Sequence, residues 1–277
     1  MKKYVVLLLL LISVFVFTNF YGGDEPAPST PVLRIGSECD YVPNSWEETT
    51  QTSFNVPIVN RQGYYADGYD VQIAKIVADE LKLVLEVKKI EWNNLIPSLN
   101  KGDIDVIFSS MLDTEERKKS IAFSDTYETR KTEYAILVES VSPYITATTL
   151  NDFKGAKIIG EKGTLLDDVI VQIPGAIHLN PSPNIQGMID AVLDGTADGC
   201  VIDTDTGHYY ENMNKSLTLI KFKDGKGFKL GFSGVCAGVR KNDTELLHRI
   251  NIALGNIQSS KRKTIMDGAA SRMMNVH

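Results

Sequence analysis

Short apolar runs alternate along the chain with longer amphipathic stretches. The run VLRIGS at 32–37 has the composition of a strand. The stretch YDVQIAKIVADELK at 69–82 repeats apolar residues at helical spacing and predicts an amphipathic helix. The apolar run LVLEVKKI at 83–90 predicts the strand that follows this helix. This alternation of strands and helices predicts an α/β fold with mostly parallel sheets.

One helix-and-strand pattern occurs twice, at a constant offset of 93 residues. LIPSLNKGDIDVIFSS at 95–110 and MIDAVLDGTADGCVID at 188–203 each contain a short amphipathic helix, a Gly, an Asp and an apolar strand in one register. The matching residues are Gly102 and Gly195, and Asp105 and Asp198. Chance is one explanation, since such units recur in α/β proteins, and two similar lobes are the other. In two lobes, Ser110 and Asp203 would each end a strand and face a ligand cleft, because ligands gather beyond the carboxyl ends of strands.

The first residues have the pattern of an export signal. Lys2 and Lys3 precede an apolar run at 4–17, which is short for a membrane span and typical of a signal-peptide core. We therefore expect a signal peptide at 1–22, a Pro-rich linker at 23–31 and a periplasmic or other extracytoplasmic location. Membrane anchoring stays open.

The composition limits the classes of partner. The formal charge of −6 becomes −8 without the two N-terminal lysines, which argues against nucleic acid or an anionic membrane and favours a small solute. Three cysteines are an odd number for an exported chain, so at least one is unpaired, and Cys200 and Cys236 lie in apolar runs where we expect them to be buried.

Motifs for metals, cofactors and catalysis are missing from the sequence. The four histidines are scattered and none is spaced with a cysteine as a metal ligand. The sequence has no G-x-x-x-x-G-K-[ST] loop, no G-x-S-x-G elbow and no H-E-x-x-H motif. We expect no cofactor, no metal site and no catalytic residues.

A predicted helix start near residue 113 places Arg117 as a candidate binding residue in the first turn of the helix. Asp113 with Glu116 fits a capping box, so the helix would begin at Asp113 or Thr114. Arg117 gains nothing from the positive end of the helix dipole. Either it belongs with the following lysines to a solvated face, or its guanidinium and the free N–H groups of the helix form an anion site suited to a carboxylate.

Three further features have both a structural and a functional interpretation. Asp203 directly follows an apolar run and could cap the next helix or face a ligand amine. EKGTLLDD at 161–168 could be only a connection, or could offer the N–H groups of Thr164 and Leu165 to an anion. Tyr41 and Trp92 could be packing residues or flat walls of a binding site.

The stretch 65–127, YADGYDVQIAKIVADELKLVLEVKKIEWNNLIPSLNKGDIDVIFSSMLDTEERKKSIAFSDTY, resembles extracellular solute-binding proteins of amino-acid ABC importers, family 3. It follows that family's series G-[FY]-D-x-[DQ]-[IL]-A, W-x-x-L-I-P-x-L-x-x-G-x-[IV]-D and T-x-[ED]-R in order and spacing. Weaker resemblance follows in FKGAKIIGEKGT, LDGTADGCVIDTDTG and SGVCAGVRKNDTELLHRIN. Together these blocks cover nearly the whole chain after residue 32.

The resemblance implies a two-lobed type II periplasmic-binding-protein fold, each lobe a mostly parallel sheet flanked by helices. It implies that lobe 1 contains 32–138 and 233–277 and that lobe 2 contains 139–232. The crossing strands would lie near EYAILVE at 133–139 and GVCAGV at 234–239.

The resemblance also assigns roles in a ligand site. It implies that Arg117 binds an α-carboxylate and Asp203 an α-amine, and that an acid at Glu38 favours a cationic side chain, although Glu38 could instead serve the amine or a neutral polar group. Leu112 departs from the family's pattern, because many members have a hydroxyl residue there, and Asn44 replaces a common aromatic residue. The other implied site residues are Tyr41, Trp92, Ser110, Thr164 and Leu165.

The implied function is capture of a free amino acid and its delivery to the permease subunits of an ABC importer by a monomeric protein. Two alternatives stay open. Some relatives on this scaffold act as cyclohexadienyl dehydratases, for which Glu38 is the obvious acid or base, and others are ligand-sensing modules.

Overall fold

The computed structural model describes residues 31–128, 133–223, 225–230 and 234–273. The predicted signal peptide at 1–22 lies outside the described residues, as does the predicted linker except for its last residue. A compact unit begins at Val32. Among the described residues no helix is long and apolar enough to span a membrane.

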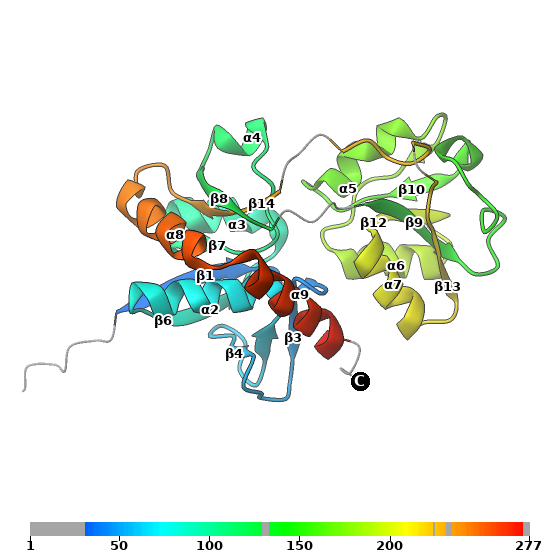
Figure 1. Cartoon of the computed structure of the whole chain (residues 1–277). Coiled ribbons are helices and arrows are strands. Elements are labelled where there is room, and N and C mark those ends of the chain that lie inside the picture. The colour runs from blue at the N-terminus through cyan, green and yellow to red at the C-terminus, as the bar shows by residue number, and fades with distance from the viewer. Residues whose placement is uncertain (1–30, 129–132, 224, 231–233, 274–277) are drawn as a thin grey trace, which may run out of the picture. The chain divides into compact units, whose positions relative to one another are not determined.

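The first sheet has five strands in the order β6-β1-β7-β14-β8 (Figure 1). Their bounds are β1 Val32–Ser37, β6 Val84–Lys89, β7 Val106–Ile107, β8 Ala122–Glu128 and β14 Val235–Val239. Strands β6, β1 and β7 are parallel, whereas β14 runs antiparallel to both of its neighbours. The sheet is therefore mostly parallel, as the sequence predicts.

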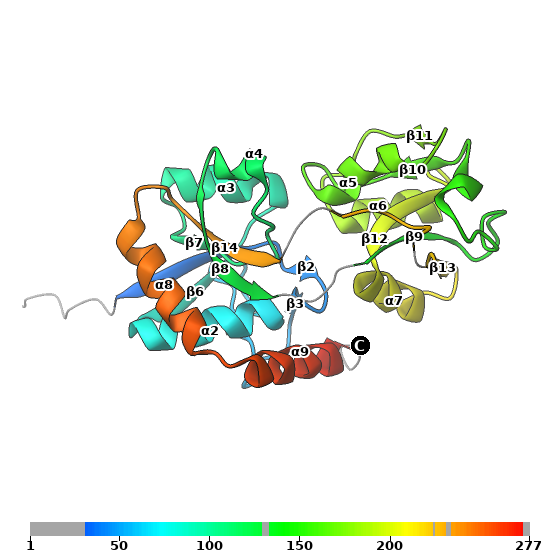
Figure 2. The same cartoon turned by 45° about the horizontal axis from the view of Figure 1, so that its top comes forward.

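Helices cover both faces of the first sheet. Helices α2 (Tyr69–Leu81) and α8 (Thr244–Asn256) pack on one face, and α3 (Trp92–Lys101) packs on the other (Figures 1 and 2). The side chains of β7 alternate between the two cores: Val106 joins the core under α2 and α8, and Ile107 joins the core under α3. The short helix α4 is Glu115–Lys118, and α9 is Ser259–Met273.

The second sheet repeats this arrangement of strands. Its order is β11-β10-β12-β9-β13, with β11, β10 and β12 parallel and β9 antiparallel to both of its neighbours. The strand bounds are β9 Tyr134–Glu139, β10 Lys157–Ile159, β11 Ile177–His178, β12 Gly199–Asp203 and β13 Leu217–Ile220. The helices are η1 Leu150–Phe153, α5 Leu165–Asp168, η2 Val169–Gln172, α6 Ile185–Leu193 and α7 Thr204–Met213. They share one hydrophobic core with the sheet.

The repeated sequence pattern makes the same local structure in both sheets. Gly102 and Gly195 both follow a helix with positive φ angles of 88° and 75°, which favour glycine. Asp105 accepts a hydrogen bond from the Arg34 backbone N–H at 3.1 Å, and Asp198 accepts one from the Lys157 N–H at 2.7 Å. In each case the aspartate directly precedes a strand and ties it to the neighbouring parallel strand, β1 in the first sheet and β10 in the second. The repeat thus reflects two similar folding units.

A small antiparallel sheet of order β2-β3-β5-β4 joins the first unit. Its strands are β2 Asp40–Tyr41, β3 Ser45–Glu48, β4 Val56–Pro57 and β5 Tyr65–Asp67. The turn between β2 and β3 carries Tyr41 and Asn44 toward the pocket described below. The pattern of apolar residues does not predict this sheet.

One segment lies in a different sheet from the one expected. Residues 134–138, assigned to lobe 1 by the resemblance, form most of β9 and pair with β12 and β13 in the second sheet. Residues Ala135 to Val138 are wholly buried there, because β9 is a central strand with a neighbour on each side. We therefore propose that lobe 2 begins at β9. The other lobe boundaries stay predictions.

All three cysteines are buried and unpaired. Cys200 and Cys236 lie within β12 and β14, as expected for small apolar residues, and burial raises the pKa of each thiol.

Candidate functional site

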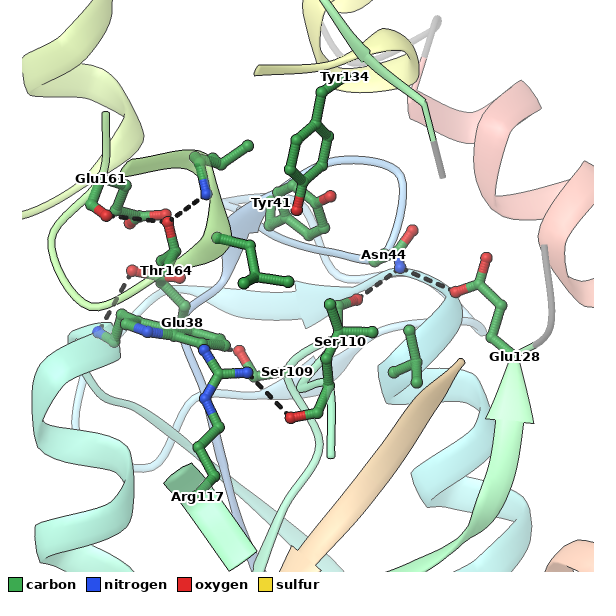
Figure 3. Close-up of a pocket in the computed structure, with 15 residues that line it drawn as sticks. Glu38, Tyr41, Asn44, Ser109, Ser110, Arg117, Glu128, Tyr134, Glu161 and Thr164 are labelled. Carbon is green, nitrogen blue, oxygen red and sulfur yellow. Dashed lines mark hydrogen bonds between the residues drawn. The ribbon is translucent and has the colours of Figure 1, made fainter. Parts of the chain in front are cut away.

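One pocket gathers eight of the nine predicted site residues (Figure 3). Those eight are Glu38, Tyr41, Trp92, Ser110, Leu112, Arg117, Thr164 and Leu165. The pocket is also lined by Asn44, Ser109, Glu128, Tyr134, Glu161, Leu166 and Val235. The lining comes from both folding units and combines apolar walls with a few polar groups, as is typical of small-molecule sites.

The helix that carries Arg117 begins one residue later than the predicted capping box requires. Thr114 is the N-cap, with an extended backbone and a hydroxyl that accepts the Arg117 N–H at 3.3 Å. Asp113 instead forms an ion pair with Lys118 at 2.8 Å. The prediction of a capping box formed by Asp113 and Glu116 was therefore wrong. Because the helix has only four residues and Thr114 already accepts one of its N–H groups, the helix adds little to an anion site.

The Arg117 guanidinium lies in the pocket against the ring of Trp92. Its carbon is 5.0 Å from the Trp92 ring centroid, and its nitrogens donate to the carbonyl oxygens of Leu112 at 3.0 Å and Gly163 at 3.2 Å. The indole N–H of Trp92 donates to the same Gly163 carbonyl at 2.9 Å. Burial lowers the pKa of Arg117 from its usual high value. No carboxylate among the described residues forms an ion pair with this guanidinium, so its contacts are neutral groups: two backbone carbonyls and the Trp92 ring.

Leu112 contributes its backbone to this arrangement. It forms an isolated β-bridge with Val235, and its carbonyl accepts the Arg117 hydrogen bond. Its side chain is partly buried and packs against the first core while lining the pocket. An apolar residue here therefore positions Arg117 through the main chain, where a hydroxyl residue was expected to assist a carboxylate through its side chain.

Ser110 belongs to a buried polar network at the floor of the pocket. Its backbone has a φ of 49°, and its hydroxyl donates to Asp70 at 2.9 Å while accepting from the Asn44 amide. The Asn44 amide also donates to Glu128 at 3.1 Å, and Tyr127 donates to Asp70 at 2.9 Å. Burial, with the nearby Glu128 charge, raises the pKa of Asp70 to about 7. Asp70 was not among the predicted site residues, although its position in the G-Y-D motif was a signal for it.

Glu38 and Glu161 bring two carboxyl groups into the pocket. Glu38 follows β1, and its side chain accepts a hydrogen bond from the Trp92 backbone N–H at 3.2 Å. The backbone N–H of Glu38 donates to the Ser109 hydroxyl at 3.1 Å. Burial, followed by the charge of Glu161, raises the pKa of Glu38 well above its usual value. Burial, followed by the charge of Asp40, raises the pKa of Glu161 to about 8. Glu161 belongs to the EKGTLLDD turn but was not among the predicted site residues.

The turn after Glu161 uses its hydroxyl within the fold. Thr164 caps α5 by accepting the Leu166 N–H at 3.1 Å, and its hydroxyl donates to the Glu161 carbonyl at 2.9 Å. The same turn presents the Gly163 carbonyl to Arg117 and Trp92. It therefore offers acceptors to the pocket. The Thr164 N–H is already donated to the Glu161 carbonyl at 3.2 Å, and donation of the Leu165 N–H to an anion stays a prediction.

Asp203 is the one predicted site residue that does not line the pocket. Its Oδ1 accepts the backbone N–H groups of Asp205 at 3.1 Å and Thr206 at 3.0 Å, so it caps α7. Its Oδ2 is buried and has no hydrogen-bond partner. Burial raises the pKa of Asp203, while burial and the Asp203 charge raise the pKa of Tyr41. Tyr41 thus lies close to Asp203 and lines the pocket itself.

No cluster of three or more His, Cys, Asp or Glu side chains suited to a metal ion occurs in the part of the chain that the structure describes. The polar groups of the pocket are those that bind charged organic groups: a guanidinium, carboxyl groups, hydroxyls and backbone carbonyls.

Two sequence relatives match almost the full length of the chain. An L-arginine-binding protein of Pseudomonas aeruginosa is 29% identical over 96% of this chain and 96% of its own length. An arginine-binding extracellular protein of Bacillus subtilis is 24% identical over 95% of this chain and 98% of its own length. A glutamine-binding protein of an ABC transporter of Bacillus subtilis is 31% identical over 71% of this chain and 69% of its own length.

Solved structures share the fold. An ancestral arginine-binding protein bound to arginine is 26% identical and aligns with a TM-score of 0.69 over 86% of this chain and 97% of that one. An amino-acid ABC transporter substrate-binding protein of Streptococcus pneumoniae aligns with a TM-score of 0.74 at 18% identity, over 90% of this chain and 98% of that one. The two-lobed α/β fold predicted from the sequence is therefore confirmed.

A family model matches residues 33–267, which is most of the chain and includes every residue of the pocket. The chain belongs to the bacterial extracellular solute-binding proteins, family 3.

Proposed function

We propose that the protein binds a free amino acid outside the cytoplasm and delivers it to an ABC importer. The observation that carries the proposal is the Arg117 guanidinium, which is half-buried in the pocket and contacts neutral carbonyls with no carboxylate of the described chain paired to it. Such a cation is stabilised by an anionic guest, and a carboxylate fits its planar donor geometry.

The remaining groups suit the rest of an amino acid. The aromatic rings of Trp92 and Tyr41 supply flat walls, and the unpartnered Oδ2 of Asp203 is an acceptor for an α-amine near Tyr41. Glu38 supplies negative charge within the same pocket. Together with the arginine-binding relatives, these groups favour a basic side chain, with arginine as the first ligand to test.

A calorimetric titration tests the proposal on the wild type and on Arg117→Ala. Loss of a charge-assisted contact to a guanidinium that the bound ligand would bury further costs about 3 kcal/mol, which is roughly a hundredfold loss of affinity. Lys118→Ala is the matched control, because Lys118 is the next residue and pairs with Asp113 and Glu115 at the surface. Equal affinity of Arg117→Ala and Lys118→Ala for every amino acid would contradict the proposal.

We further propose that the protein is a binding protein and has no catalytic activity. The sequence relatives described above bear the names of binding proteins. The rival is a dehydratase on this scaffold, with a carboxyl group of the pocket as its acid. Incubation with prephenate or arogenate, followed by product analysis, separates the two functions, because only a dehydratase converts these acids.

The same proposal includes delivery to an importer, a monomeric state and export from the cytoplasm. The family is extracellular, and the predicted signal peptide at 1–22 agrees with export. Neighbouring genes for a permease and an ATPase would support delivery to an importer over a sensory role. Light scattering of the mature chain with and without arginine tests the monomeric state.

A further inference from the structure

Two carboxyl groups from different folding units meet in the pocket. Glu38 follows β1 and Glu161 follows β10, and both side chains are almost fully buried, with 4% and 3% of their surface exposed. Both side chains line the same pocket, and the charge of Glu161 contributes to the raised pKa of Glu38. Because two neighbouring buried carboxyl groups strongly resist being ionised together, one of the pair keeps a proton.

No cation of the described chain neutralises this pair. The titratable groups that interact with the pair are Asp40, Glu91 and Tyr134. The nearest cations act on these neighbours: Lys89 on Asp40 and Arg117 on Tyr134. Lys89 forms an ion pair with Glu47 at 3.0 Å, and Arg117 donates to two backbone carbonyls. The neighbouring acids add negative charge, so the surroundings oppose full ionisation of both carboxyl groups.

One oxygen of the pair is left without a partner. The Trp92 N–H bonds to Oε1 of Glu38, whereas Oε1 of Glu161 is buried with no hydrogen-bond partner although its residue lines the pocket. An unsatisfied buried carboxyl oxygen costs free energy in the empty protein. A donor supplied by a ligand would remove that cost, so the atom identifies a place for a cationic or N–H group.

We propose that Glu161 and Glu38 together form the receptor for the cationic end of a basic amino acid, and that this cation displaces the proton that the two carboxyl groups share. This inference rests on the proposed function and adds Glu161 as the residue that determines specificity. The empty pair has one proton and one negative charge. On binding, the proton leaves to the solvent, and two carboxylates face one guanidinium or ammonium group.

The exchange makes affinity depend on pH in one direction. The empty pair binds one proton more than the occupied pair, so a higher pH favours binding of arginine or lysine. Because the pKa of Glu161 is about 8, this dependence operates below that pH, with a gain of about tenfold in affinity per pH unit while one proton is released. Glutamine has no side-chain charge and shares the α-carboxylate and α-amine, so its binding releases no proton from the pair.

Calorimetry near neutral pH in phosphate and in imidazole buffer measures the number of protons released when the ligand binds. The apparent binding enthalpy changes with the ionisation enthalpy of the buffer in proportion to the protons released. We expect about one proton per L-arginine or L-lysine bound to the wild type and about none per L-glutamine. Glu161→Gln and, independently, Glu38→Gln should abolish the proton release and weaken arginine at least tenfold.

Glu91→Gln is the matched control, since Glu91 is an exposed neighbour that does not line the pocket, and this variant should keep the release. Arginine binding to the wild type with no proton released would overturn the inference, as would release that persists in both pair variants. A wild type that binds glutamine and neither arginine nor lysine would also overturn it and leave the proposed function standing. Failure to bind any amino acid would overturn the proposed function itself.

Discussion

The C-terminal helix α9 holds the small antiparallel sheet through one buried ion pair. Two nitrogens of Arg272 each contact an oxygen of Asp67 at 2.7 Å, and only 1% of the Asp67 side chain is exposed. The Arg272 guanidinium also lies 4.3 Å from the ring centroid of Phe54. Asp67 keeps one other bond, from the Gly68 N–H at 2.6 Å. Removing Arg272 therefore leaves a buried carboxylate with a single donor.

We expect Arg272→Met to lower the free energy of unfolding by about 3 kcal/mol, at the low end of the range for breaking a buried pair. The matched control on the same helix is Lys263→Met, because Lys263 pairs with Asp267 at 2.6 Å but both side chains are largely exposed. That change should cost about 0.5 kcal/mol or less. The difference between the losses of unfolding free energy in the two variants measures the effect of burying the ion pair.

Urea unfolding followed by tryptophan fluorescence is the assay. Both tryptophans, Trp46 and Trp92, belong to the first unit, so the signal reports the part of the chain that contains the ion pair. The Arg272→Met midpoint should fall by about 1 to 3 M urea with an unchanged slope. The double variant Arg272→Met with Asp67→Asn should recover part of the loss, since no charge is left buried. Equal midpoints for Arg272→Met and Lys263→Met would refute the reasoning.

Three further predictions concern the pocket. The pKa of Asp70, about 7 in the folded protein against an ordinary value of 3.8, makes the folded state bind the extra proton, so stability should fall as pH rises from about 4 to about 7, by at most about 4 kcal/mol. Asp70→Asn should flatten this trend in urea unfolding at several pH values, and an unchanged slope against pH would contradict the assignment. Trp92→Leu removes the ring beside Arg117 and should weaken amino-acid binding about fivefold or more in calorimetry, whereas unchanged affinity would exclude a role for the ring. Asp203→Asn keeps an N-cap for α7 and should change the free energy of unfolding by less than about 1 kcal/mol. A loss of affinity of this variant for all amino acids would support the role of Asp203 toward the α-amine, and unchanged affinity would reject that role.

The elements that could be predicted are those whose apolar spacing already matches their final surroundings. The predicted helix at 69–82 corresponds to α2 at Tyr69–Leu81, and its buried face includes Val71, Ala74 and Val77. The strand at 32–37 has the predicted bounds. In these segments the local pattern and the tertiary packing favour the same structure.

The start of α4 was predicted wrongly because two local solutions had similar free energies. Asp113 and Thr114 are both good N-cap residues, and the backbone of the preceding loop, bonded from Thr114 N–H to the Leu112 carbonyl at 3.0 Å, decides for Thr114. Likewise the apolar strand at 134–138 could extend either sheet by its sequence alone. In the fold this strand lies between β12 and β13 and pairs with both of them.

Apolar periodicity and motif spacing are local properties of the chain, so they predicted the alternation of helices and strands, the repeated unit and the candidate Arg117, while the family resemblance added Glu38. Folding was needed to place Glu161 and Glu38 in one pocket, to link Ser110 to Asp70 and to leave Asp203 outside the pocket lining. The physical reason is that the charge state of a carboxyl group depends on its burial and on neighbours far away in sequence, which the fold alone places beside it.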